Sequence, residues 1–150
     1  MVCRKGEVTG FVMNKNYRRL MFVLVGLFAL TSFARIDVFP QSFDQGGWAL
    51  DCQFMDVMGS PYLLAHGLGR PVSDARASVS LPAPGDYRVW VRSRNWTDGA
   101  PGRFTVIVGG KPLAVEFGAA QREWGWEDGG VVSVAQRDVE VRLHDLTGFE

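Results

Sequence analysis

From Trp48 onward, apolar residues recur at every second position rather than in the 3.6-residue period of a helix. The clearest case is the segment 86–94, where Tyr87, Val89 and Val91 fall on one face of an extended chain. The opposite face carries Arg88, Trp90, Arg92 and Arg94. Glycine and proline turn signals separate such segments at short intervals. The pattern predicts an all-β fold of at least six short strands.

Local signals predict how these strands connect. Gly109-Gly110 lies between the alternating segments 104–108 and 113–117, as is typical of a β-hairpin. Segments 131–134 and 139–143 are expected to form a further pair. Residues 53–58 leave room for only one or two helical turns before Gly59. Many short strands without intervening helices indicate a β-sandwich of the jelly-roll, galactose-binding-like type.

The amino-terminal third has a different character. Residues 20–30 are uninterrupted apolar sequence, preceded by Arg18 and Arg19 and followed by small residues at Ser32 and Ala34. This order is typical of a secretory signal helix, with cleavage expected after Ala34. The alternative, a membrane anchor at residues 20–34, is shorter than the roughly 20 apolar residues of a span. Met13 is an alternative start of the protein.

The expected domains are therefore a signal peptide, residues 1–34, and an exported β-sandwich module, residues 35–150, in the periplasm or outside the cell. The chain ends at Glu150 directly after a predicted strand, so we expect a module that is truncated at its carboxyl end. Contact with the membrane is expected only through an uncleaved signal.

Charge and cysteine content narrow the possible partners. Residues 35–150 keep 11 basic and 15 acidic residues, and this net charge of −4 without a basic run argues against nucleic acid. Of the two cysteines, Cys3 lies in the segment expected to be removed, so no intrachain disulfide is expected.

Three motifs suggest chemistry but lack its context. Gly67-Leu68-Gly69 has no third glycine and no βαβ unit, so we expect a tight loop rather than a dinucleotide site. His66 and His144 lack metal-ligand spacing, and no metal site is predicted. His144 and Asp145 are adjacent on a strand and point to opposite faces, so we expect them to order a turn. An interface is the other role considered for His66, His144 and Asp145.

Aromatic residues are the best candidates for ligand binding. Most of the five tryptophans are expected in the core, with Trp90 as the exception because it shares a face with arginines. Glu116, Glu123, Glu127 and Asp128 surround Trp124 and Trp126, which fits sugar chemistry in outline, but no catalytic pair is assigned. The candidate ligand-binding residues are Trp90, Arg92, Arg94, Trp96, Trp124 and Trp126.

Longer motifs carry a family resemblance. The stretches at 46–75, 85–96, 100–106, 124–130 and 143–150, including YRVWVRSRNW and WGWEDGG, look like those of one family. They resemble the β-sandwich module, termed xanthan-lyase-like or golvesin-like, that opens secreted bacterial FAD-dependent oxidoreductases. The resemblance implies an exported parent that acts on polysaccharide-derived material and binds FAD in a following Rossmann-type flavin domain.

This chain contains no match to the glycine-rich loop of that flavin domain, so it is expected to hold no cofactor and to be catalytically silent. The expected function is an accessory module that binds or presents carbohydrate. Its expected partners are a polysaccharide or oligosaccharide and the carboxyl-terminal flavin domain. The alternatives are a structural domain that docks on the flavin domain, and an accessory domain of a polysaccharide lyase or hydrolase.

Overall fold

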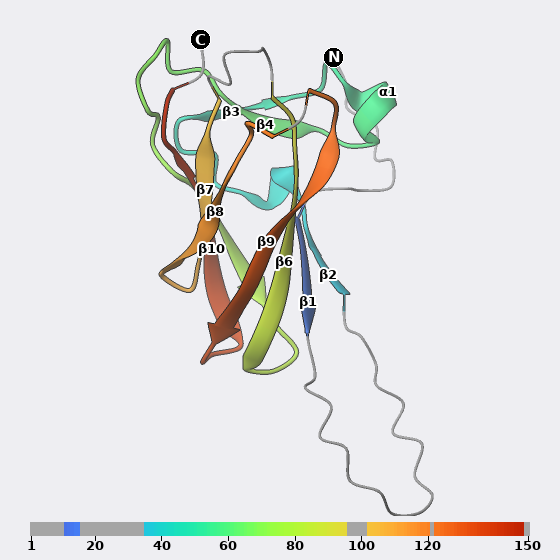
Figure 1. The fold of residues 1–150 in the computed structure, drawn as a ribbon, viewed down its shortest axis with the longest axis vertical. Helices are drawn as coiled ribbons and strands as arrows, with labels where there is room; N and C mark the ends of the chain where they lie inside the picture. Colours follow the sequence, from blue (N-terminus) through green and yellow to red (C-terminus); the bar gives the residue numbers. More distant parts are fainter. Residues whose placement is uncertain (1–10, 16–34, 96–101, 121, 149–150) are drawn as a thin grey trace, which may run out of the picture.

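The computed structural model describes residues 11–15, 35–95, 102–120 and 122–148. Within these residues the regular secondary structure is almost all antiparallel strand, as Figure 1 shows, so the prediction of an all-β fold is confirmed. The helical elements are the single turn η1 (Pro40–Ser42) and α1 (Met55–Met58), which ends at Gly59 with a φ of 73°.

The strands form two four-stranded sheets and one small hairpin sheet. The first sheet has the order β2 (Arg35–Val38), β1 (Phe11–Lys15), β6 (Gly85–Ser93), β9 (Gly125–Val134). The second sheet has the order β5 (Ala75–Ser80), β10 (Asp138–Asp145), β7 (Phe104–Val108), β8 (Lys111–Phe117). The third pairs β3 (Trp48–Asp51) with β4 (Tyr62–Ala65) across one end of the molecule (Figure 1).

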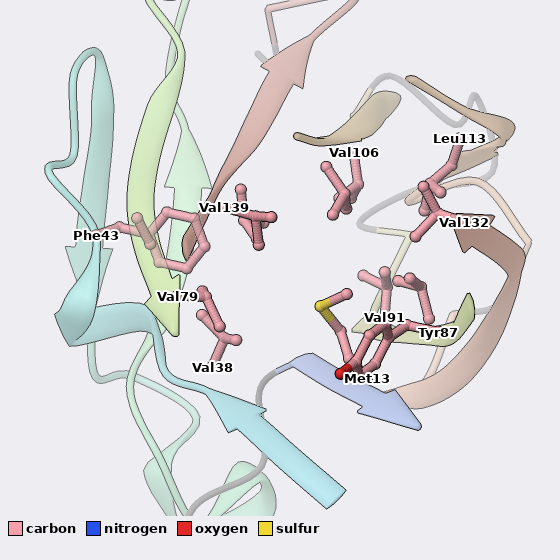
Figure 2. Packing of buried hydrophobic residues seen from close by; sticks show 14 of the residues in the cluster. Met13, Val38, Phe43, Val79, Tyr87, Val91, Val106, Leu113, Val132 and Val139 are labelled. Carbon is pink, nitrogen blue, oxygen red and sulfur yellow. The ribbon is translucent and has the colours of Figure 1, made fainter. Parts of the chain in front are cut away.

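One hydrophobic core is shared by the two larger sheets. Along β6, Tyr87, Val89 and Val91 are buried, as the alternation predicts. Their neighbours in the core include Val106 of the second sheet, and Figure 2 shows side chains from both sheets meeting in this space. Burial of one face of each sheet against the other gives the sandwich-like arrangement.

The predicted hairpin at Gly109-Gly110 is confirmed. Strands β7 and β8 pair, with Val108 opposite Lys111, so that the two glycines alone make the turn. Their φ angles are 56° and 79°. A two-residue turn that matches the twist of its strands requires positive φ at both positions, which glycine adopts without strain.

The predicted pairing of segments 131–134 and 139–143 is wrong. Strand β9 pairs with β6 in the first sheet, whereas β10 pairs with β5 and β7 in the second. The link at residues 135–137 therefore passes from one sheet to the other. Val132 and Val139 still point into the same core, so each strand keeps the alternation that suggested a hairpin.

Strand β1 lies within the segment expected to be a signal peptide. It occupies the position between β2 and β6, and pairs with both. Met13 is fully buried and belongs to the same core cluster as Tyr87 and Val91, which Figure 2 also labels. The apolar residues 20–34 lie outside the described residues, and in the part of the chain that is described no helix is long and apolar enough to cross a membrane.

The expectation of an unpaired Cys52 is also wrong. Cys52 is disulfide-bonded, and its partner lies outside the described residues. The expectation depended on removing residues 1–34, because Cys3 is the only other cysteine in the sequence.

Candidate functional site

A cavity of about 140 Å³ opens at the end of the sandwich that β3 and β4 cross. Its walls come from β3, β4, the ends of β6 and β10, the start of β7 and the residue before β9. The aromatic lining residues are Phe43, Trp48, Tyr62, Phe104 and Trp124. Three arginines, Arg92, Arg94 and Arg103, also line it. The cavity therefore joins apolar ring surface with positive charge.

The aromatic wall is held by contacts between rings and by one partly buried hydrogen bond. Tyr62 and Trp124 lie 5.0 Å apart between ring centroids, and Trp48 meets Phe104 edge-on at 5.7 Å. Such contacts favour defined ring orientations. The Tyr62 hydroxyl donates to Asp51 Oδ2 at 2.9 Å. Asp51 lies on β3, directly opposite Tyr62 in the pairing of β3 with β4.

This hydrogen bond changes the titration of both groups. Burial, together with the bond to Asp51, raises the pKa of Tyr62, so the hydroxyl remains a neutral donor. Burial alone would raise the pKa of Asp51, but hydrogen bonds from Gln53, Tyr62 and Cys52 outweigh it and lower that pKa. Asp51 is thus an ionised anchor for Tyr62.

Two indole N–H groups at the cavity lack an acceptor. Nε1 of Trp48 and Nε1 of Trp124 are buried and have no hydrogen-bond partner among the described residues. The Trp48 residue is only 7% exposed. Buried N–H groups in folded proteins are almost always paired, so these two donors are exceptions among the described residues, and both belong to residues that line the cavity.

The arginines at the cavity are held in place by their surroundings. Arg92 donates through Nη1 to the carbonyl oxygen of Met58 at 3.1 Å, which ties the end of β6 to α1. The guanidinium carbon of Arg94 lies 4.7 Å from the centroid of the Phe54 ring, a cation–π contact. Arg103 forms an exposed ion pair with Glu116.

Asp145 is the only carboxylate among the described lining residues, and it has a structural role. Its Oδ2 accepts from the backbone N–H of Val72, and its Oδ1 accepts from those of Thr147 and Gly148. His144, one residue earlier, is exposed and lies 2.8 Å from Asp74 through Nδ1. The side chains of His144 and Asp145 thus lie on opposite faces of β10, and Asp145 orders the turn that follows.

The structure separates the six candidate ligand-binding residues. Arg92, Arg94 and Trp124 line the cavity, whereas Trp90 and Trp126 lie outside its lining. Trp90 is half-buried beneath the Arg88 guanidinium at 5.7 Å, and Trp126 is 37% exposed. Trp96 lies outside the described residues.

Sequence reasoning missed Trp48, Tyr62, Phe104 and Arg103 as lining residues. Trp48 was expected only as core, and it is buried as expected, but it also forms the cavity wall. The expectation that Trp90 alone stands apart from the core is wrong, because Trp124 is half-buried and Trp126 exposed. None of these residues carried a local signal, because even the pairing of Tyr62 with Asp51 joins β3 to β4 across the segment that contains α1.

The remaining motifs have structural partners. The amide of Gly69 donates to the Gly148 carbonyl, and a Cβ on Gly67 would lie 1.8 Å from the Arg70 carbonyl oxygen, so the loop at His66 is a tight turn. Among the proposed hydrolase carboxylates, Glu127 contacts Ser93 and Asp128 contacts Arg88. No group of three or more metal-ligating side chains occurs among the residues that the structure describes.

Comparison with known proteins found no similar protein. No family model matches the chain, and neither a curated protein nor a solved structure is significantly similar to it.

Proposed function

We propose that this chain is a non-catalytic saccharide-binding module, and that its sugar occupies the cavity at the β3–β4 end of the sandwich. The observation that carries the proposal is the pair of buried, unpartnered indole N–H groups of Trp48 and Trp124 in an aromatic wall. Sugars present apolar C–H faces that pack on aromatic rings, and hydroxyl oxygens that accept hydrogen bonds. The lining offers both kinds of contact.

The size of the cavity limits how much of a sugar it can enclose. A cavity of about 150 Å³ in another protein accommodates benzene, a six-membered ring without substituents. The cavity here measures about 140 Å³. A pyranose carries hydroxyl groups in addition to its ring, so the cavity has room for part of one sugar unit, and the rest of the saccharide would lie in solvent.

The wider context of the module is also a proposal. The signal-like segment at residues 20–34 supports export, and the motifs at 46–75 and 124–130 support a parent enzyme of the FAD-dependent oxidoreductase type. Two facing antiparallel sheets of four strands support the jelly-roll assignment. In this account the flavin chemistry belongs to a separate domain, and the cavity captures or presents saccharide.

The test is binding of the purified chain to a panel of polysaccharides and oligosaccharides. Trp124→Ala removes a ring from the cavity wall and is expected to weaken binding at least tenfold, as for a buried aromatic anchor. Trp126→Ala is the matched control, because Trp126 lies on β9 outside the lining and should leave affinity unchanged. Absence of binding to every glycan would contradict the proposal.

A docking role on the flavin domain is the second candidate. Leu68 is 82% exposed at the tip of the loop that follows His66, and it has a positive φ of 50°. A contact between Leu68 and the flavin domain would remove this apolar side chain from water. If it docks, the flavin domain should raise the melting temperature of the module, and Leu68→Ser should abolish the increase. An unchanged melting temperature would exclude this role.

A further inference from the structure

We infer that the cavity recognises an acyl ester carried by the saccharide, of which the acetyl group is the simplest form. This inference rests on the proposed function, because it names the part of the saccharide that the cavity encloses. The ester is bound and not cleaved.

The residues that line the cavity are mostly apolar. In addition to the aromatic rings they include Val38, Leu63, Leu64 and Leu143. A sugar hydroxyl placed against such a wall loses its hydrogen bonds to water without replacing them, which is unfavourable. A hydrocarbon group placed there leaves water with a gain in free energy. The lining therefore favours an apolar substituent of the sugar over a bare hydroxyl group.

The volume of the cavity leads to the same group. At about 140 Å³ the cavity has room for part of one sugar unit. An acetyl ester is smaller than benzene, which a cavity of about 150 Å³ accommodates. The ester can therefore enter the cavity together with the sugar carbon that bears it, while the remaining hydroxyl groups stay in water.

The hydroxyl and carboxylate groups of the lining already have partners inside the protein. The Tyr62 hydroxyl donates to Asp51 at 2.9 Å, and the Ser93 hydroxyl contacts Glu127. Both oxygens of Asp145 accept backbone N–H groups. A ligand does not have to satisfy these groups.

The arginines of the lining are engaged as well. Arg92 donates to a backbone carbonyl oxygen of α1, and Arg94 lies over the ring of Phe54 at 4.7 Å. Arg103 forms an ion pair with Glu116. The arginines therefore serve to hold the wall together, and the inference requires no charge on the ligand.

The indole N–H groups of Trp48 and Trp124 differ from these groups, because they are buried and have no partner among the described residues. Both tryptophans line the cavity. A sugar hydroxyl that accepted from an indole would bring a proton of its own into an apolar space, where that proton needs another acceptor. An ester carbonyl accepts without bringing a proton. An acyl ester thus combines an apolar group for the wall with an acceptor for these donors.

Matched ligands test the inference by calorimetry with the full chain. Oligosaccharides of the panel are first freed of natural esters with mild alkali. One portion is then acetylated at random positions, a second portion is ethylated to the same degree, and a third is left unmodified. The ethyl ether has two carbons like the acetyl group but lacks its carbonyl oxygen, so the two contributions can be measured separately.

The acetylated oligosaccharide is expected to bind most tightly. The ethylated form should bind about threefold more tightly than the unmodified form, because it places apolar surface in the cavity. The acetylated form should bind a further threefold to tenfold more tightly, roughly the contribution of a neutral hydrogen bond. Equal affinity of acetylated and unmodified forms, or of acetylated and ethylated forms, would overturn the inference and leave the proposed function intact. Failure of all three forms to bind would contradict the proposed function itself.

Tryptophan variants locate the donor. Trp48→Phe and Trp124→Phe each keep an aromatic ring and remove the N–H, so at least one of them should lose the preference for acetyl over ethyl. Trp90→Phe is the matched control, because Trp90 lies outside the lining, and it should keep that preference. Melting temperatures verify that each variant folds. A preference that survives in both Trp48→Phe and Trp124→Phe would show that neither N–H binds the carbonyl, which overturns the inference.

Discussion

Asp145 shows how one buried side chain can organise the end of a strand. It accepts three backbone hydrogen bonds, from Val72 on one side and from Thr147 and Gly148 on the other. Asp145→Ala would leave three N–H groups without their acceptor, so we expect the free energy of unfolding to fall by about 3 kcal/mol. Urea denaturation measures this change.

The neighbouring residue supplies the control for that measurement. His144 is exposed, and its contact with Asp74 lies at the surface. His144→Ala should change the free energy of unfolding by less than about 0.5 kcal/mol. A similar loss in both variants would contradict the structural role of Asp145.

The ion pair between Arg88 and Asp128 predicts a pH dependence. The hydrogen bond from Arg88 lowers the pKa of Asp128 below its usual 3.8. Because the folded pKa is depressed, the pair stabilises the fold above the unfolded value and this contribution is lost as the pH falls below about 3.8. As the pH falls from about 5 to about 2.5, we expect the urea midpoint of Asp128→Asn to decrease less than that of the parent.

The partially exposed location of this pair supplies a check. Added salt screens surface charges, and at about 0.5–1 M salt the Debye length is only a few ångströms. Salt at this concentration should therefore reduce the difference between the pH profiles of the urea midpoint of Asp128→Asn and of the parent. Identical pH profiles for the two proteins at low salt would show that the pair does not act in this way.

Individual site residues were only partly predictable from the sequence. Arg92 and Arg94 drew attention because charged residues alternate with apolar ones on a strand, and that local pattern requires no knowledge of the fold. Trp48 could not be identified, because a buried tryptophan that fills a core and one that lines a cavity have the same sequence pattern. The difference depends on which distant residues surround the ring.

At the scale of elements, the alternation of apolar and polar residues and the turn glycines predicted where the strands lie, but they predicted less well which strands pair. Strands β7 and β8 were predictable as a pair because the two-residue turn at Gly109-Gly110 permits no other arrangement. Strands β9 and β10 were not, because the link at residues 135–137 is long enough to pass between sheets. Pairing then depends on hydrogen-bonding edges supplied by segments remote in sequence.

The place of strand β1 in the first sheet can be tested directly. Met13 is fully buried between the strands that flank β1, so Met13→Ala in the full chain should lower the free energy of unfolding by about 2–5 kcal/mol. Val57→Ala, at an exposed position on α1, is the control and should have little effect. Equal urea midpoints for Met13→Ala and the parent would exclude β1 from the folded sheet.

Export adds a second measurement on the same element. If cleavage occurs after Ala34, the intact mass of the exported protein should correspond to a chain that begins at Arg35. Such a chain lacks β1, and β2 would lose its neighbour in the first sheet. A mass that retains residues 11–15 would instead contradict cleavage at that position.

At the scale of the molecule, the two larger sheets share one core, and the third sheet crosses one end of the sandwich (Figure 1). Residues from the ends of β6, β7 and β10 line the cavity together with residues of β3 and β4. The all-β class followed from local alternation, but the cavity depends on how three sheets come together. That arrangement is a long-range property, which is why the sequence indicated candidate ligand-binding residues without placing the cavity.

The most direct test of the account is a titration followed through the indole N–H groups by proton–nitrogen correlation spectroscopy. The chain is titrated with the oligosaccharide of the panel that binds most tightly, and single Trp→Phe variants assign each resonance. The account predicts that the resonances of Trp48 and Trp124 shift on saturation, because their N–H groups gain acceptors, while those of Trp90 and Trp126 stay in place. Unchanged Trp48 and Trp124 resonances, or shifts confined to Trp90 and Trp126, would contradict it.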